Sequence, residues 1–415
     1  MKYIALLMII LLSATTFADL TNEYYLERFC PTDYDARARA MGRTGIVNST
    51  GSGSIFYNPA NIGRLDGITF QAGARARFGS MDNDDFYDDR EGHYWEGKYE
   101  FHPKITSVSF AMPYGLPPAE RISIAFGIGY NPYYDGASKK NTELQYHSSP
   151  GNIYTTTNDI KDIGGLNTIS PAVAITFNDQ YSVGLAYNKS VMSKKGVRNE
   201  CSHKSKSQTE STEREFESEF DGSFVTLGVI AQPIPELTIG ATYRSGFRLV
   251  EKNRTYTFTD ADGNKTTKYW EKAPNELPAI IALGVAYHVA PTVLVAGEYQ
   301  TRTFSDARLY GPKRDIDDGA CYRIGVEFQS SVLFRAGMFS DAILITDEDD
   351  DTPRTLKGIT VGVGIVSNNV TYDFFGEYSQ WSYAHEWGTD FGDTKFDYKE
   401  THLILGGSIT VTLKR

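Results

Sequence analysis

The chain has 415 residues, a formal net charge of −11 and a mean hydropathy of −0.36, and 13% of its residues are aromatic. The acidic balance excludes nucleic acid as a partner. After the first 18 residues, no stretch approaches the ~20 consecutive apolar residues that a membrane-spanning helix requires. The composition therefore excludes an inner-membrane helical protein and leaves an exported soluble protein or a transmembrane β-barrel.

The N-terminus has the features of a secretory signal peptide. Lys2 precedes an apolar run from Ile4 to Leu12, and small residues occupy the −3 and −1 positions of a cut after Ala18. This pattern is typical of an exported chain and differs from that of a membrane anchor. We expect residues 1–18 to be removed.

Residues 19–66 are too irregular for a strand. They include the runs 36–47 and 51–60, which do not alternate between apolar and polar side chains. We expect a compact segment that precedes the first strand.

From about residue 67 to the C-terminus, apolar side chains recur at every second position. In the first such stretch Phe70 and Ala72 flank Gln71, and in a later one Ile122, Ile124 and Phe126 alternate with smaller residues. A period of two indicates strands with one apolar face. We count about fourteen strands, an even number as in bacterial barrels.

The connections between these strands alternate between short and long. Short ones such as 178–180 and 367–369 carry turn residues, whereas long ones such as 132–167 and 191–220 are polar, charged and rich in tyrosine. Outer-membrane barrels have tight periplasmic turns and long outer loops. The sequence therefore predicts an all-β, antiparallel transmembrane β-barrel over residues 67–415, located in a bacterial outer membrane with lipid around it.

A barrel of this size has a lumen wider than its own side chains fill, so it is either open or plugged. We expect residues 19–66 to lie in the lumen as a plug. Charged side chains of both signs occupy the alternate strand positions that we expect to face the lumen; they are Arg75, Arg77, Arg244, Glu298, Arg323, Glu327, Arg335, Asp373 and Glu377. Two roles remain open for them: salt bridges to Arg37, Arg39, Arg43 and Arg64 of the plug, or a solvated wall with cross-strand ion pairs.

Other motifs do not indicate chemistry. The three cysteines have no metal or redox spacing, and both a Cys201–Cys321 disulfide and free thiols remain open. The stretch 260–264 lacks the distant glutamate of a calcium loop, so we expect a hairpin tip. The stretch 51–54 lacks the strand-to-helix context of a nucleophile elbow. We expect no metal, no cofactor and no enzyme activity.

Several motifs carry a resemblance to a known family. The "ARAMG…G…A…NPA" run after the signal peptide, and the later stretches 276–287, 322–327 and 334–337, resemble the FadL/TodX family of outer-membrane transporters of hydrophobic compounds. Related plugged barrels, notably PorV-like secretion components, share the first motif. The resemblance implies that the plug is a hatch, with Gly42, Gly45, Asn58, Pro59 and Ala60 as its motif.

The resemblance also implies where cargo leaves the barrel. The family is thought to release it sideways at a kinked strand, and the third strand here contains Gly127 and Gly129 followed by Asn131 and Pro132. Glycine weakens strand pairing and proline cannot donate a ladder hydrogen bond. The alternative is a glycine-rich face packed against the hatch.

Three functions remain open. The first is passive uptake of hydrophobic small molecules such as long-chain fatty acids. The second is a PorV-like scaffold that binds a partner protein, and the third is a surface barrel with adhesive loops. Two features depart from the fatty-acid transporters: the chain ends in Leu413, Lys414 and Arg415 without a terminal aromatic residue, and the runs 82–85 and 347–351 place charge in outer loops.

Overall fold

We describe the fold from a computed structural model of the chain. The structure describes residues 35–83, 93–116, 121–135, 138–148, 152–191, 194–204, 209–260, 262–270, 274–308, 316–344, 352–389 and 392–414. The helices in this part of the chain are too short and too polar to cross a bilayer. They are α2 (Ala36–Ala40), η2 (Ser52–Phe56), η3 (Pro59–Arg64) and η4 (Phe304–Asp306).

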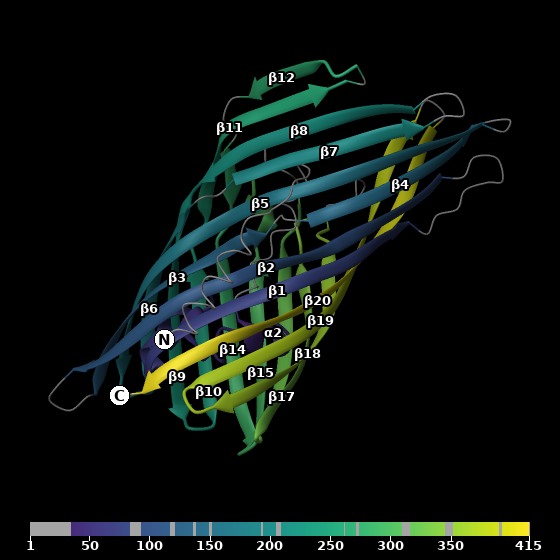
Figure 1. Ribbon diagram of the computed structural model, residues 1–415. Helices are drawn as coiled ribbons and strands as arrows, with labels where there is room; N and C mark the ends of the chain where they lie inside the picture. Colours follow the sequence, from purple (N-terminus) through teal and green to yellow (C-terminus); the bar gives the residue numbers. More distant parts are fainter. Residues whose placement is uncertain are drawn as a thin grey trace.

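Fourteen strands form a closed antiparallel ring (Figure 1). In ring order they are β1 (Gly67–Asn83), β2 (His93–Leu116), β3 (Ile122–Asp135), β5 (Asn152–Phe177), β6 (Tyr181–Ser190), β9 (Ser223–Ile234), β10 (Leu237–Arg244), β14 (Ile280–Ala290), β15 (Val293–Arg302), β16 (Gly319–Phe328), β17 (Val332–Ala342), β18 (Thr355–Ser367), β19 (Val370–Thr389) and β20 (Gly392–Lys414). The ring closes where β20 pairs with β1, from Gly67 opposite Lys414 to Asn83 opposite Tyr398. The predicted fourteen-strand barrel is confirmed.

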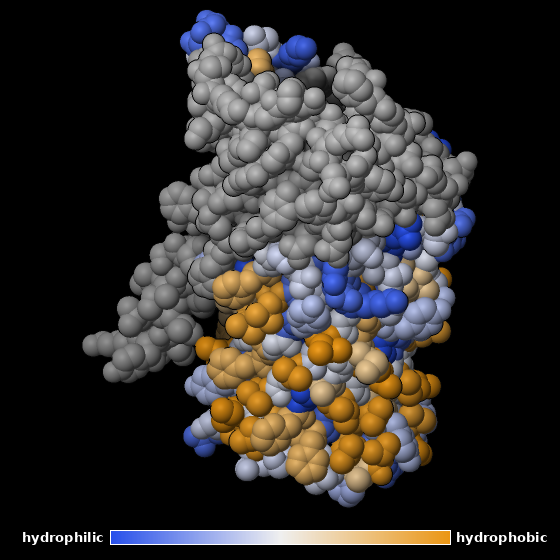
Figure 2. Space-filling model, turned by 90° about the vertical axis from the view of Figure 1, so that its right-hand side faces the viewer, coloured by the Kyte–Doolittle hydropathy of each residue, from blue (hydrophilic) through white to orange (hydrophobic). Residues whose placement is uncertain are grey.

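An apolar belt surrounds the outside of this ring. Outward side chains on the alternating positions stay exposed although they are large, as Phe126 (54%), Val361 (60%) and Met338 (58%) show. Figure 2 shows apolar side chains gathered over the lower part of the face that it draws. A soluble protein does not expose a continuous apolar surface of this kind, whereas a barrel in lipid requires one. The barrel therefore spans a membrane.

The short connections lie at one end of the barrel, which we call the turn end. At the β5–β6 turn, Asn178 and Asp179 have φ values of 51° and 56°. Two consecutive left-handed residues are the signature of the tight turns that match strand twist, and asparagine and aspartate tolerate them better than other side chains. The predicted turn at 178–180 is confirmed.

The long connections are mostly strand, which corrects the expectation that they are loops. Six further strands continue the wall beyond the ring at the opposite end, which we call the loop end (Figure 1). They are β4 (Ser138–Ser148), β7 (Lys194–Lys204), β8 (Thr209–Asp221), β11 (Phe247–Thr259), β12 (Lys265–Trp270) and β13 (Pro274–Leu277). Most of their residues are polar, because a sheet outside the membrane has no lipid to face; the exceptions Phe247 and Leu249 of β11 and Leu277 of β13 are buried inside the barrel.

Asp260 and residues 262–264 form the tip of the β11–β12 hairpin, as the sequence predicts. The Asp260 carboxylate accepts hydrogen bonds from the side-chain amide of Asn264 (3.0 Å) and from the backbone N–H groups of Asn264 (2.8 Å) and Asp262 (3.0 Å), which lowers its pKa. Gly263 supplies the positive φ of 84° that the turn needs. The Asp260 carboxylate is thus used in holding the turn.

The two cysteines for which the sequence leaves a disulfide or free thiols open lie on strands that do not neighbour each other. Cys321 is buried on β16, which pairs with β15 and β17. Cys201 lies on β7, which pairs with β5 and β8, and its side chain is outside the described part of the chain.

Candidate functional site

The N-terminal segment, residues 35–66, lies against the inward face of the ring at the turn end. Nearly all of its residues are buried. Its helix α2 is only five residues long, and the Asp35 carboxylate caps it by accepting from the Arg37 N–H at 3.1 Å. Gly42 and Arg43 then have φ values of 67° and 65°, so the chain reverses immediately after the helix. The helix is therefore short, and the turn that follows it keeps this part of the segment compact.

The five residues of the predicted hatch motif make close contacts within this segment or with the wall. A Cβ on Gly42 would stand 2.3 Å from the Ile324 carbonyl oxygen of the wall, and one on Gly45 would stand 2.3 Å from the Tyr57 ring. Only glycine fits at these two positions. Close contacts therefore explain why both positions are glycine.

The Asn58-Pro59-Ala60 part of the motif joins the segment to the wall. The Asn58 amide donates to the carbonyl oxygens of Ile46 and Val229, both at 3.1 Å, and its Oδ1 accepts from the Ala60 N–H at 3.1 Å. Pro59 begins η3, where its fixed φ suits the first helical position. The Ala60 carbonyl accepts from the Ser182 hydroxyl of β6 at 2.8 Å.

Glycines on the inward face of the wall receive the segment. Gly228 on β9 is opposite Gly184 on β6, and Gly325 on β16 is opposite Gly337 on β17. A Cβ on Gly228 would lie 1.9 Å from Asn58 Oδ1, and one on Gly337 would lie 2.1 Å from the Gly42 nitrogen. The wall backbone therefore touches the segment directly.

Gly127 and Gly129 of β3 belong to the same inward surface. A Cβ on Gly127 would lie 2.7 Å from Ile55, and one on Gly129 would lie 2.4 Å from Phe56. The alternative weighed from the sequence, a glycine face packed against the N-terminal segment, therefore describes these two residues.

We expect Gly337→Ala to loosen the N-terminal segment. The added methyl group meets backbone atoms of Met41 and Gly42, which cannot rotate away, and overpacking of this kind costs about 1–3 kcal/mol. Limited proteolysis of the folded protein in liposomes should then cleave within residues 35–66 faster than in the wild type. Gly297→Ala is the matched control, because its Cβ meets nothing closer than Val285 at 3.7 Å. Equal cleavage of the two variants would contradict the expectation.

A buried network of ion pairs holds the same segment on its other side. Arg37 donates to both oxygens of Glu327 at 2.8 Å, and Arg39 donates to Glu377 at 2.9 and 3.1 Å. Arg43 donates to Glu377 at 2.6 Å and to Asp341 at 3.0 Å. Three arginines on one short stretch therefore bind carboxylates from β16, β17 and β19.

Wall residues complete the network. Arg323 donates to Asp341 (2.9 Å) and Glu298 (2.8 Å), and Arg335 donates to Glu327 (2.6 Å) and Asp373 (2.6 Å). Glu298 also accepts from the backbone N–H of Gly45 at 2.8 Å. The members are the arginines Arg37, Arg39, Arg43, Arg323 and Arg335 and the acids Glu298, Glu327, Asp341, Asp373 and Glu377. Each of these buried groups has at least one partner of opposite charge, which is what burial of charges requires.

Six of the nine residues predicted for the inward charge ladder belong to this network: Glu298, Arg323, Glu327, Arg335, Asp373 and Glu377. Arg75 and Arg77 lie on β1, and Arg244 lies on β10 in a separate cluster. Of the four arginines expected on the segment, Arg64 differs, because it donates to the neutral Gln232.

Sequence reasoning missed three neutral anchors and one acid. Gln71 accepts from the Gly53 N–H at 2.8 Å, and Thr360 accepts from the Gly42 N–H and donates to the Ala40 carbonyl, both at 2.9 Å. Ser182 and Asp341 complete the set. All four lie on inward strand positions, so the alternation of inward and outward side chains that predicted the charged residues also applies to these four.

Above the segment, a single apolar cluster continues toward the loop end of the lumen. Ile55, Phe56 and Ile62 of the segment lie in the same cluster as Phe224, Phe247 and Leu277 of the wall and Phe304 of η4; these side chains are all buried. Tyr133 contacts the rings of Phe224 and Phe247, with centroids 4.6 and 5.9 Å apart. A buried apolar cluster therefore extends inside the barrel from β13 and η4 to the N-terminal segment.

Two polar side chains in this apolar region have unused donors. Arg244 is 8% exposed; it donates to the Tyr133 hydroxyl (3.1 Å) and the Phe56 carbonyl (3.3 Å), but its Nε has no partner. Asn131 is 1% exposed, and its Nδ2 also has no partner. A buried donor without an acceptor is costly. Arg244 and Asn131 therefore each have a donor left for one further hydrogen bond.

The wall is unpaired next to Asn131. Pairing between β2 and β3 ends at Val108 opposite Tyr130, and β2 next pairs on that side with β4, beginning at Tyr99 opposite Lys140. In the described part of the chain no ladder joins β2 to a neighbour on this side between those points. Asn131 and Pro132 pair with β5 alone, and the register of that pairing shifts after Pro132. The predicted opening residues Asn131 and Pro132 thus lie at the interruption, whereas Gly127 and Gly129 lie in the paired part.

No protein-family model and no curated protein sequence matches the chain. Solved structures do match. CymD, a monoaromatic hydrocarbon channel, has a TM-score of 0.59 and 13% identity, covering 93% of this chain and 99% of CymD. A Pseudomonas aeruginosa FadL homologue has a TM-score of 0.56 and 11% identity, covering 95% of this chain and 99% of the homologue. The Ralstonia pickettii toluene transporter TbuX has a TM-score of 0.56 and 14% identity, covering 93% and 100%. The chain therefore has the fold of the FadL/TodX channels that its N-terminal and strand motifs resemble.

Proposed function

We propose that this protein is an outer-membrane channel for the passive uptake of hydrophobic compounds. The observation that carries the proposal is the apolar cluster that leads from the loop end to the N-terminal segment, beside the interruption between β2 and β3. Removal of apolar area from water, at ~25 cal/mol per Å², supplies the attraction. The proposed route ends sideways in the membrane, and the N-terminal segment acts as the hatch that closes the lumen toward the periplasm.

We further propose that the cargo includes long-chain carboxylates. The two unused donors, Arg244 Nε and Asn131 Nδ2, lie in apolar surroundings near the interruption. A carboxylate accepts charge-assisted hydrogen bonds from such groups while its alkyl chain contacts Phe224 and Phe247. The CymD and TbuX likenesses support hydrocarbon cargo as well, and the experiment below includes both classes.

The direct test is uptake by liposomes that contain the purified protein. Entry of a labelled long-chain fatty acid and of labelled toluene is measured beside a variant without residues 19–64. We expect saturable entry that changes when this segment is absent. A folded barrel that admits neither compound would contradict the proposal, and pull-downs from outer membranes would then test the scaffold function.

Closing the interruption between β2 and β3 is expected to block release. Ser107 and Asn131 follow directly after the last pair on the inward face and are both buried. In a chain whose native cysteines are replaced by alanine, we introduce Ser107→Cys and Asn131→Cys and join them with a cleavable bis-maleimide. Uptake should fall to the level of empty liposomes and return after cleavage of the linker. Each single variant treated with the reagent is the control, and unchanged uptake in the linked protein would exclude this exit.

A further inference from the structure

We propose that the site at Arg244 binds aromatic carboxylates in preference to saturated ones, and that such a compound takes the place of the Tyr133 side chain. The inference rests on the proposed function, because it names the class of cargo that the same site selects. Tyr133 already places a ring and an oxygen atom at this site, and the geometry of its contacts indicates what the site fits.

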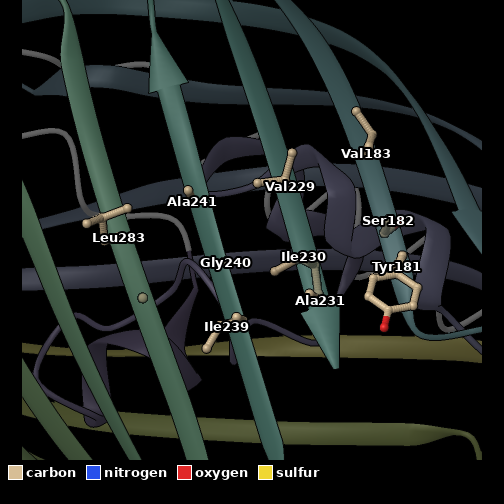
Figure 3. A pocket seen from close by; sticks show the side chains of 11 residues that line it. Tyr181, Ser182, Val183, Val229, Ile230, Ala231, Ile239, Gly240, Ala241 and Leu283 are labelled. Atoms are coloured by element: carbon tan, nitrogen blue, oxygen red, sulfur yellow. The ribbon is translucent and has the colours of Figure 1, made fainter. Parts of the chain in front are cut away.

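The site lies on the inward face of the wall. Ile239 and Ala241 of β10 line a shallow depression on the opposite, lipid-facing side (Figure 3). Arg244 follows three residues after Ala241, and successive side chains of a strand point to opposite sides of the sheet. Arg244 is accordingly buried, whereas the neighbouring Tyr243 is 44% exposed. The guanidinium group therefore faces the lumen and not the lipid.

Aromatic rings surround this guanidinium group. The rings of Phe224 and Phe247 are stacked, with centroids 4.8 Å apart and planes 29° apart. The Arg244 guanidinium carbon lies 5.7 Å from the Phe224 centroid and 5.1 Å from the Tyr133 centroid. A ring bound in these surroundings gains stacking and cation–π contacts in addition to the burial of its apolar area. A saturated group gains the burial alone, so the rings favour an aromatic compound.

Tyr133 occupies the site in the way that an aromatic compound with an acceptor group would. Its ring contacts Phe224, and its hydroxyl accepts from Arg244 Nη1 at 3.1 Å. Arg244 Nε has no partner in the described part of the chain. A carboxylate on a ring offers two oxygens and a negative charge where Tyr133 offers one neutral oxygen, and Arg37 already uses both oxygens of Glu327 at 2.8 Å. An aromatic carboxylate therefore satisfies Arg244 better than Tyr133 does.

The backbone at Tyr133 allows its side chain to leave. One extra residue of β3 is inserted between the pairs Pro132–Asn167 and Tyr134–Leu166, which makes Tyr133 a β-bulge. Bulges direct side chains at the rims of barrels and beside binding sites. The pairing of β3 with β2 has already ended before this point. The Tyr133 side chain can therefore turn away while the pairs on either side of the bulge remain formed.

The test compares two probes of equal charge. Binding of labelled benzoate and of labelled cyclohexanecarboxylate to the purified protein in a non-ionic detergent is measured by equilibrium dialysis, with empty micelles as the blank. Aromatic contacts favour benzoate, so its dissociation constant should be lower by a factor of about two to ten. Phe224→Leu keeps an apolar side chain and removes a ring, so it should bring the two dissociation constants together. Equal dissociation constants in the wild type would overturn the proposal.

Tyr133→Phe tests the displacement of Tyr133. The change removes the hydroxyl that competes with the carboxylate for Arg244, and a hydrogen bond to a charged group corresponds to about tenfold or more in affinity. Benzoate should therefore bind about tenfold or more tightly than to the wild type. Tyr243→Phe removes a hydroxyl on the lipid-facing side and is the matched control, with wild-type affinity expected. Unchanged or weaker binding to Tyr133→Phe would overturn the displacement.

Dialysis separates this inference from the proposed function, because binding in detergent does not require passage across a membrane. A protein that prefers benzoate in dialysis but admits no compound into liposomes would contradict the proposed function alone. A protein that admits fatty acid into liposomes but binds benzoate and cyclohexanecarboxylate equally would contradict the preference for aromatic carboxylates alone.

Discussion

Replacing Glu377 by glutamine is expected to release the N-terminal segment from β19 and to raise the ion conductance of the barrel. Glu377 is fully buried and accepts hydrogen bonds from both Arg39 and Arg43. Glutamine keeps the size of the side chain but removes the charge that balances two buried guanidinium groups. Breaking a buried pair in this way costs roughly 3–5 kcal/mol. The cost acts on the contact between segment and wall, because both arginines belong to the segment.

Planar bilayers give the measurement. The wild type should conduct weakly if the segment closes the lumen, and Glu377→Gln should show larger or more frequent openings. Glu236→Gln, an exposed residue of the β9–β10 turn, removes the same charge at the surface and should conduct like the wild type. The temperature at which the barrel unfolds, read from its migration in detergent gels, controls for a folding defect. Wild-type conductance from a folded Glu377→Gln barrel would show that this network does not hold the segment in place.

The network is strong because its arginines are also packed against rings. The Arg43 guanidinium lies 3.8 Å from the centroid of the Phe339 ring, and that of Arg39 lies 5.3 Å from the Phe375 ring. Such contacts are worth about 0.5–2 kcal/mol each. They also fix the planar groups so that their hydrogen bonds point at Glu377 and Asp341. Lysine at position 39 or 43 would provide charge without this orientation.

The membrane part of the fold follows from the sequence because lipid imposes a simple rule on it. Every outward side chain must be apolar, so strands such as β6 and β16 alternate strictly and can be counted. The same rule places Glu327 and Arg335 on the inward face. Outside the membrane the rule no longer applies. Over residues 194–204, 209–221 and 251–259, polar residues occur at both odd and even positions of the sequence, so no period of two indicates these strands.

The partners of the charged residues could be predicted only in part. Sign and parity indicate that inward acids meet the arginines of the segment, and Arg37, Arg39 and Arg43 do so. The sequence does not distinguish Arg244 from the inward residues of the network. The difference is the height in the lumen at which β10 places its side chain. For Gly127 and Gly129 the sequence leaves two interpretations open, weak strand pairing or a face packed against the hatch, since a close approach of the segment leaves no mark in the sequence except the missing side chain.

Arg244→Met is expected to separate the two classes of cargo. Methionine retains much of the apolar stem of arginine and removes the guanidinium, so the cluster with Tyr133 and Phe224 should stay packed. A hydrogen bond to a charged group is worth about 1.5–3 kcal/mol, so the affinity for a long-chain carboxylate should fall by about tenfold or more. Uptake of toluene should remain near the wild-type value, because a neutral hydrocarbon has no group for Arg244 to bind.

The concentration dependence of uptake decides between a binding role and a structural one. A lost carboxylate contact raises the fatty-acid concentration needed for half-maximal entry, whereas a damaged barrel lowers entry of both compounds at all concentrations. Arg248→Met on β11 removes an exposed arginine four positions further along the chain and is the matched control. If Arg244→Met changes neither compound, the donor at Arg244 plays no part in binding cargo. The alternative for it is then a purely structural one, in which Arg244 fastens Phe56 of the N-terminal segment to β10 through the 3.3 Å hydrogen bond to its carbonyl oxygen.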